Sequence, residues 1–186
     1  MRGKLIVVSG PSGVGKDTVV SKYIERNTNT YLSISCTSRP IRDGEVDGVN
    51  YIFLSREEFE ERINNGDLLE YAEYNGNYYG TPKYKMEEEL NNGKDVILII
   101  EVQGALKVMD MYPDALFIFI LPPSMDELKE RLEGRGTDSI ESINKRLETA
   151  LKEIEVSPKY DYRIVNDNLD RAVLELENII KKEKTE

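Results

Sequence analysis

The chemistry that the sequence suggests most strongly is phosphate binding by a glycine-rich segment near the N-terminus. The segment Gly10-Pro-Ser-Gly-Val-Gly-Lys16 lies between a short apolar run and a stretch with helical character. Successive backbone N–H groups of such a loop can surround a phosphate, and the following helix adds positive potential at its N-terminus. Lys16 would place a point charge on the same anion. The alternative is an ordinary strand–helix turn, which the agreement of position, spacing and lysine disfavours.

The residue after the lysine departs from the usual phosphate-loop pattern, which has Ser or Thr there as a magnesium ligand. This chain has Asp17 instead, followed by Thr18. A carboxylate suits a first helical turn, but it would repel a polyphosphate unless Mg²⁺ lay between them. We predict Asp17 and Thr18 as metal-binding residues, directly or through water; a solvated aspartate at a helix start explains Asp17 equally well. The predicted ATP-binding residues of this segment are Gly10, Pro11, Ser12, Gly13, Val14, Gly15, Lys16, Asp17 and Thr18.

The composition excludes several other kinds of chemistry. The chain has 186 residues, about one domain, and a net charge of 25 − 35 = −10, so we expect no nucleic-acid partner. It has no histidine, and Cys36 is the only cysteine, which excludes a Ser-His-Asp triad and a cysteine-based zinc cluster. The longest apolar run, 115–121, is far too short for a membrane span, so we expect a cytoplasmic protein without a membrane partner.

Apolar runs and helical segments alternate along the chain, which is typical of an α/β fold with crossover helices. Residues 4–9, 95–101, 115–121 and 162–165 have the apolar or β-branched character of buried strands in a parallel sheet. A helix is predicted at 16–26, and another should run from near Ser139 and stop at Ser157-Pro158. Further helix boundaries are predicted from capping signals at Ser55, Thr81-Pro82 and Ser124, and from glycines at Gly66, Gly93 and Gly134.

Two stretches interrupt this alternation. Residues 35–81 contain short alternating strands with a hairpin turn at Asn75-Gly76, which predicts a small mixed or antiparallel insertion. Residues 124–147 form an arginine-bearing helical excursion between two core strands. The core is then left with residues 1–34, 82–123 and 148–186, and both excursions could move relative to it.

The sequence resembles the guanylate kinase family over residues 3–182. The likeness rests on separated segments in one order: GPSGVGK (10–16), SCTSRPIRDGEVDGVNY (35–51), LLEYAEYNGNYYGTP (68–82), IEVQGA (100–105), RLEGRGT (131–137), INKRL (143–147) and IVND (164–167). The resemblance implies phosphoryl transfer from MgATP to GMP and also to dGMP. It also implies a phosphate-loop NTPase-like fold: a parallel five-stranded sheet with helices on both faces, the insertion as GMP-binding region and the helical excursion as lid.

The family's GMP-binding residues fall on the insertion and on one strand end. Arg39 and Arg42 match the arginines that hold the GMP phosphate, since planar guanidinium groups can bind it bidentately. Glu70 matches the residue that accepts both guanine donors, N1–H and the exocyclic amine, which adenine cannot offer together. The other matched residues are Ser35, Glu45, Tyr51, Tyr79, Thr81 and Glu101; packing within strands remains an alternative for the tyrosines, as does the polar end of a buried strand for Glu101.

The lid and the phosphate-binding arginines match at Arg131, Arg135 and Arg146, which would bring positive charge to the transferred group as the lid closes. We take Lys16, Arg42, Arg135 and Arg146 as the catalytic set and Arg131 as ATP-binding. Asn166 matches a position near the adenine, although loop capping explains it almost as well. The family often has an acid where this chain has Ile99, and our hypothesis is that Asp17 replaces its negative charge near Mg²⁺.

The mechanism implied is in-line transfer of the ATP γ-phosphoryl group to a GMP phosphate oxygen. The acceptor phosphate has a second pKa near ~6 and is mostly ionised at neutral pH, so no general base is required. Two alternatives remain. A guanylate-kinase-like binding module would normally have lost Lys16 and the lid arginines, and a kinase for another nucleoside monophosphate or a small alcohol is disfavoured by Glu70 with Ser35.

Overall fold

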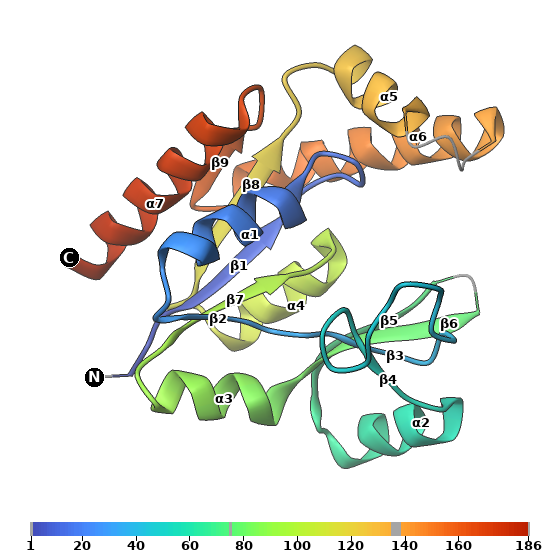
Figure 1. Ribbon diagram of the computed structural model, residues 1–186, viewed down its shortest axis with the longest axis vertical. Coiled ribbons are helices and arrows are strands. Elements are labelled where there is room, and N and C mark those ends of the chain that lie inside the picture. The colour runs from blue at the N-terminus through green and yellow to red at the C-terminus, as the bar shows by residue number, and fades with distance from the viewer. Residues whose placement is uncertain (1, 75, 135–138, 186) are drawn as a thin grey trace. The chain divides into compact units, whose positions relative to one another are not determined.

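The computed structural model describes residues 2–74, 76–134 and 139–185. Five parallel strands form the main sheet in the order β2-β7-β1-β8-β9, as labelled in Figure 1. They are β1 (Leu5–Ser9), β2 (Thr30–Leu32), β7 (Asp95–Ile99), β8 (Leu116–Leu121) and β9 (Tyr162–Val165). The parallel five-stranded sheet predicted from the sequence is confirmed.

A second sheet of four short strands has the order β4-β3-β6-β5. β5 and β6 form the predicted antiparallel hairpin, β3 pairs antiparallel with β6, and β3 pairs parallel with β4, so the sheet is mixed. The turn residue Asn75 lies outside the described residues, while Gly76 has a left-handed φ of 74°. The strands are β3 (Cys36–Thr37), β4 (Ile52–Phe53), β5 (Leu68–Tyr74) and β6 (Asn77–Pro82).

The chain divides into two compact units. The first comprises residues 1–5, 29–98 and 103–114 and contains the second sheet; the other comprises 6–28, 99–102 and 115–186. Helices of the first unit are α2 (Arg56–Asn65), α3 (Lys83–Asn91) and most of α4 (Val102–Met111). Helices of the other unit are α1 (Lys16–Arg26), α5 (Met125–Glu133), α6 (Ile140–Val156), the 3-10 turn Ser157–Lys159 and α7 (Leu169–Thr185).

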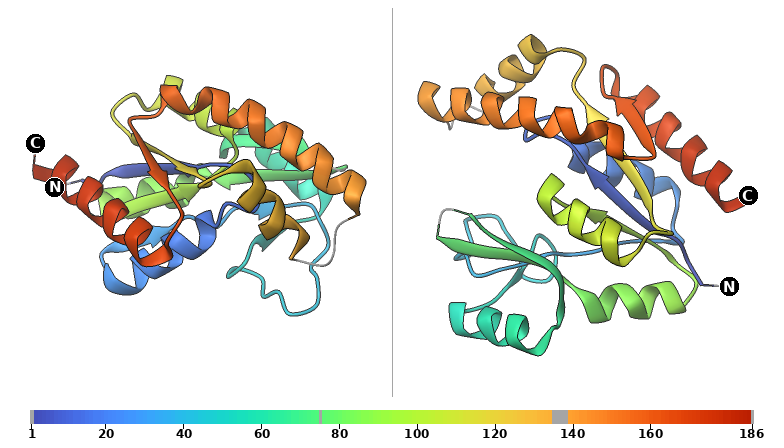
Figure 2. Two further views of the ribbon diagram at one scale, coloured as in Figure 1. Left: turned by 90° about the horizontal axis from the view of Figure 1, so that it is seen from above. Right: turned by 180° about the vertical axis from the view of Figure 1, so that it is seen from behind.

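Each unit is held together by buried apolar strands and the helices that cover them. In the unit formed by residues 6–28, 99–102 and 115–186, four strand residues have no exposed surface, as expected for strands buried on both faces: Val7, Val8, Ile118 and Phe119. There α1 packs beside α7, which the two views of Figure 2 also show. Among the described residues, no helix is long and apolar enough to cross a bilayer.

Most predicted helix boundaries are confirmed. Ser55 forms both halves of a capping box with Glu58, and Gly66 ends α2 in the left-handed conformation. Ser124 accepts a hydrogen bond from the Glu127 amide at the start of α5. At the end of α5, however, Gly134 is right-handed, with φ −62°. Gly93 has a left-handed φ but follows Asn92, the residue that caps α3.

The prediction that Thr81 caps a helix is wrong. β6 continues through Pro82, and α3 begins at Lys83 with no side-chain capping bond from Pro82. The Thr81 hydroxyl instead donates a hydrogen bond to Glu70 Oε1 on the facing strand, at 2.7 Å. The strand register places Glu70 opposite Thr81. The Thr81 hydroxyl therefore bonds to a carboxylate across the hairpin, and not to a backbone amide at the start of a helix.

Candidate functional site

The phosphate loop, Gly10–Lys16, follows β1 and leads directly into α1. Gly13 and Gly15 have φ values of 86° and 93°, in a backbone region that residues with a side chain rarely adopt. A Cβ on Gly15 would lie 2.7 Å from Asn166 Nδ2, and one on Gly13 would lie 2.7 Å from Leu132 Cδ2. The positive φ values thus favour glycine at both positions, and an added Cβ would also have to displace the side chain of Leu132 or Asn166.

Lys16 is almost completely buried in this loop, with 8% of its surface exposed. Its Nζ donates hydrogen bonds to the carbonyl oxygens of Gly10, at 2.6 Å, and Pro11, at 3.2 Å. Both of these hydrogen-bond partners are neutral carbonyl groups, and the carboxyl group of Glu153 is close enough to interact electrostatically with the ammonium. A bound phosphate could take over these donors, because the lysine side chain rotates more freely than the loop backbone.

Two predicted arginines and Asn166 dock on the same loop. The Asn166 Nδ2 donates to the Val14 carbonyl at 2.8 Å. Arg131 donates to that same carbonyl at 3.3 Å and to the backbone carbonyl of Asn166 at 2.8 Å. From α6, Arg146 donates to the Ser12 hydroxyl at 3.2 Å. The structure therefore brings Arg131, Arg146 and Asn166 to the phosphate loop, while Arg135 lies outside the described residues.

The predicted metal-binding residues lie at the start of α1. The side chains of Asp17 and Thr18 are both exposed there, and Asp17 is the acidic residue of the first turn. The side chain of Ile99, at the end of β7, has no oxygen atom to offer a metal ion. Within the described part of the chain, no three His, Cys, Asp or Glu residues are grouped to hold a metal. Hard oxygen donors at a phosphate loop suit Mg²⁺, which takes most of its ligands from nucleotide phosphates and water.

The structure adds one residue that the sequence analysis missed, Glu153 on α6. Its carboxyl forms a hydrogen bond with Glu101. Burial, followed by the charge of Glu101 and this hydrogen bond, raises the pKa of Glu153 to about 7, while Lys16 nearby acts in the opposite direction. Glu153 is seven residues after Arg146, two helical turns, so the spacing alone places both on one face of a predicted helix.

Eight of the nine predicted GMP-binding residues lie in the first unit. Several of them interact with one another in two groups, one around Arg39 and Glu45 and the other around Glu70 and Thr81. Arg39, with 8% exposure, donates from both terminal nitrogens to the Glu45 carboxylate at 2.9 and 2.8 Å. These bonds, with one from the Arg42 amide, lower the pKa of Glu45 to about 2. Arg39 also lies over the Tyr51 ring, 5.4 Å from its centre, and Tyr51 makes an edge contact with Tyr79.

The second group is Glu70 with Thr81 on the β5–β6 hairpin. Thr81 is 1% exposed, and its hydroxyl fixes one carboxylate oxygen of Glu70. Ser35 lies just before β3 and is half-buried. Glu101 belongs to the other unit, where its side chain is exposed beside Glu153.

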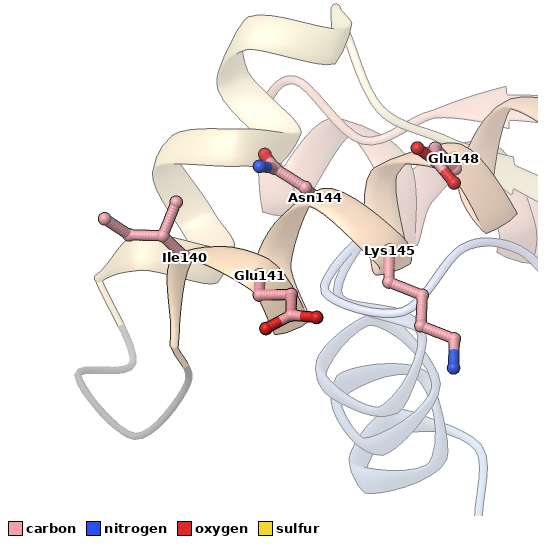
Figure 3. Close-up of a pocket in the computed structure, with 5 residues that line it drawn as sticks. All are labelled: Ile140, Glu141, Asn144, Lys145 and Glu148. Carbon is pink, nitrogen blue, oxygen red and sulfur yellow. The ribbon is translucent and has the colours of Figure 1, made fainter.

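A surface depression on α6 is shown in Figure 3, and its residues are not among those predicted. The five lining residues all come from this one helix, and two of them are acidic. Ile140 at its rim is 80% exposed. A depression lined by two carboxylates and one lysine does not favour the binding of a polyanionic nucleotide. The lining residues are Ile140, Glu141, Asn144, Lys145 and Glu148.

A strand–glycine loop–helix unit with a buried lysine and docked arginines, on a five-stranded parallel sheet, defines the class of phosphate-loop kinases. Shikimate kinase from Bacteroides thetaiotaomicron shares this fold, with a TM-score of 0.55 and 14% identity over 96% of this chain and 98% of that one. The crystal structure of guanylate kinase from Anaplasma phagocytophilum is similar at a TM-score of 0.82 and 37% identity, covering 100% of this chain and 88% of the other.

Comparison with known sequences identifies the family within this class of kinases. The guanylate kinase family model matches residues 2–183. The guanylate kinase of Clostridium perfringens strain 13 is 54% identical over 98% of this chain and 85% of its own length. That of Streptococcus pneumoniae strain R6 is 55% identical over 98% of this chain and 88% of its own. The chain belongs to the guanylate kinase family.

The Glu101–Glu153 pair predicts a pH dependence of stability. Because the folded-state pKa of Glu153 lies above the ordinary value of 4.5, the folded protein binds the extra proton, and stability falls as pH rises from about 4.5 to 7. We expect a loss of roughly 1–2 kcal/mol, since partial exposure screens the interaction. The neutral variant Glu153→Gln should remove this fall, as measured by urea unfolding between pH 5 and 8.

The matched control is Glu148→Gln, which changes an exposed glutamate on the same helix and should keep the wild-type slope. The groups that face Glu153 are Glu101, Lys16 and Tyr160. An unchanged slope in Glu153→Gln would show that another group is responsible.

Proposed function

We propose that the protein transfers the γ-phosphoryl group of MgATP to GMP, and also to dGMP, giving ADP and the nucleoside diphosphate. Family membership supports the reaction, with ATP as donor and GMP as acceptor. The observation that carries the acceptor assignment is the Glu70 carboxylate, fixed by Thr81 in the unit that also holds Arg39 and Arg42. A fixed carboxylate can accept the N1–H and the exocyclic amine of guanine side by side.

In this proposal the phosphate loop, Gly10–Lys16, binds the ATP phosphates through its N–H groups, and Asn166 supports it near the adenine. Arg131, Arg135 and Arg146 bring positive charge to the transferred group. Arg131 and Arg146 already donate hydrogen bonds to the loop, to the Val14 carbonyl and the Ser12 hydroxyl. Ser35, Thr81 and Glu101 complete the base site, while Arg42 and Arg39, with Glu45, Tyr51 and Tyr79, hold the GMP phosphate. No side chain has to remove a proton, because the acceptor phosphate is already ionised at neutral pH.

Mg²⁺ would be held by the nucleotide phosphates together with Asp17 and Thr18, and it would supply charge neutralisation between the phosphates. We further propose a functional division into a core (1–34, 82–123 and 148–186), a GMP-binding insertion (35–81) and a lid (124–147). A cytoplasmic location is consistent with small-molecule substrates of this kind. The protein-binding role of a scaffold module is disfavoured because Lys16, Arg131 and Arg146 are retained and docked on the loop.

The substrate assignment is tested by a coupled assay of ADP release with GMP, dGMP, AMP and UMP as acceptors. We expect GMP and dGMP to be used and AMP to be rejected by about 10³-fold or more, since adenine leaves the carboxylate unpaired. Activity with AMP or UMP that matches GMP would replace this proposal with a different monophosphate kinase. Absence of ADP release with all four would favour a binding module.

Glu70→Gln tests the base-reading role separately. The amide presents a donor where guanine also presents one, so kcat/KM for GMP should fall roughly 100-fold while KM for ATP stays within about twofold. Steady-state kinetics with each substrate varied in turn measures both values. An equal loss toward ATP and GMP would remove Glu70 from base recognition.

Asp17→Ser tests the compensation between Asp17 and Ile99. If Asp17 supplies negative charge near Mg²⁺, the Mg²⁺ concentration needed for half-maximal rate should rise about tenfold in the variant. Glu25→Gln, an exposed change about 12 Å further along α1, is the control and should leave that concentration unaltered. If Asp17→Ser keeps the wild-type magnesium dependence, the hypothesis fails.

A further inference from the structure

Gly104 in the first turn of α4 lies directly against the carboxyl group of Glu70. A Cβ built on Gly104 would be 2.8 Å from Glu70 Oε2, 3.1 Å from Cδ and 3.3 Å from Cγ. Real Cβ atoms essentially never approach another atom as closely as 2.8 Å. The Glu70 carboxylate therefore occupies the space that any side chain at position 104 would need.

The backbone of Gly104 gives no other reason for glycine. Its φ is not among the positive values that favour this residue, and it lies inside a regular helix, where alanine is intrinsically the better residue. All three atoms closest to the added Cβ belong to the Glu70 side chain. The glycine is thus explained by the carboxylate packed on it.

The two carboxylate oxygens of Glu70 have different neighbours. Oε1 accepts the hydrogen bond of the buried Thr81 hydroxyl at 2.7 Å, whereas Oε2 lies over Gly104. Gly104 is the third residue of α4. The first backbone N–H groups of a helix have no hydrogen-bond partner within it, and they form the positive end of the helix dipole. An anionic carboxylate is stabilised at that end, provided that no side chain intervenes.

We propose that Gly104 is a specificity-positioning residue, which sets the place of the Glu70 carboxylate and thereby the discrimination between guanine and other purines. The proposal rests on the function proposed above. A methyl group at position 104 would push the carboxylate by several tenths of an ångström or rotate it away from Thr81. A carboxylate that reads two parallel donors tolerates such a shift poorly, whereas one that reads a single donor can turn to follow it.

The experiment compares GMP with IMP, which keeps the N1–H but lacks the exocyclic amine. Gly104→Ala should lower kcat/KM for GMP about tenfold or more and that for IMP much less, so the GMP to IMP ratio falls. KM for ATP should stay within about twofold. Gly134→Ala is the matched control, because its Cβ meets nothing closer than 3.3 Å and its φ is right-handed; its GMP to IMP ratio should equal that of the wild type.

A double-mutant cycle assigns the effect to Glu70. In the Glu70→Ala background the carboxylate is gone, so adding Gly104→Ala should change the GMP to IMP ratio less than twofold. If Gly104→Ala does not fold, the same cycle is read by thermal unfolding, and the Glu70→Ala/Gly104→Ala double variant should fold. An unchanged ratio in folded Gly104→Ala, full additivity in the cycle, or an unfolded double variant would each overturn the proposal.

The two proposals fail in different ways. If the wild-type protein does not phosphorylate GMP, the proposed function is wrong and the comparison with IMP has no basis. If the wild type prefers GMP to IMP and Gly104→Ala keeps that preference, the function stands and the role of Gly104 is overturned.

Discussion

The constraint on which the rest of the molecule depends is electrostatic: a chain with a net charge of −10 has to bind polyanions. It meets this constraint by fixing a few cations locally on neutral acceptors. Lys16 donates to two carbonyls, Arg131 to two more, and Arg146 to a hydroxyl, all on or beside the phosphate loop. Hydrogen bonds to neutral partners hold a cation in place without adding an opposing charge, which favours the binding of an incoming phosphate. Lys16 also interacts electrostatically with the Glu153 carboxyl group. Arg131 has a carboxylate within 4 Å as well, Glu127 at 3.5 Å, but that glutamate is half exposed and screened by water.

How far the sequence predicts this arrangement depends on how local each feature is. The phosphate loop and its flanking strand and helix follow from a few adjacent residues, and α1 begins and ends where the pattern predicts. The capping box at Ser55 and the stop at Ser157-Pro158 are equally local. Thr81 shows where prediction from local sequence fails. Its hydroxyl donates to Glu70 on the neighbouring strand, eleven residues away, and the capping rule considers only residues within the first turn of a helix.

The residues that escaped the sequence analysis share one property: their role depends on a packing partner distant in the chain. Glu153 is one of many acids on an amphipathic helix, and only its contact with Glu101 distinguishes it. Gly104 stands in a segment that supported the family resemblance, yet its relation to Glu70 depends on how α4 packs beside the hairpin strand. Periodicity places such residues on a face, but it does not say which side chain lies opposite that face.

The two arginines assigned to the GMP phosphate are not equivalent, and the hydrogen-bond inventory of Arg39 shows why. A guanidinium has five N–H donors in a fixed plane. Arg39 already donates to the Pro40 carbonyl and to both oxygens of Glu45, and Tyr79 also forms a hydrogen bond with it. The end of the fork that would bind phosphate bidentately is therefore occupied by Glu45, and a phosphate can reach Arg39 only from its side or by displacing that carboxylate.

Arg42 has the opposite character. Its side chain is exposed, and its link to Glu45 runs through its backbone amide, so the guanidinium fork does not take part in that bond. Glu45 thus performs two tasks at once: it orients Arg39 and closes the turn that carries Arg42. If these two arginines bind the GMP phosphate as proposed, we expect Arg42 to make the bidentate contact and Arg39, held by Glu45, to contribute positive charge from a fixed position.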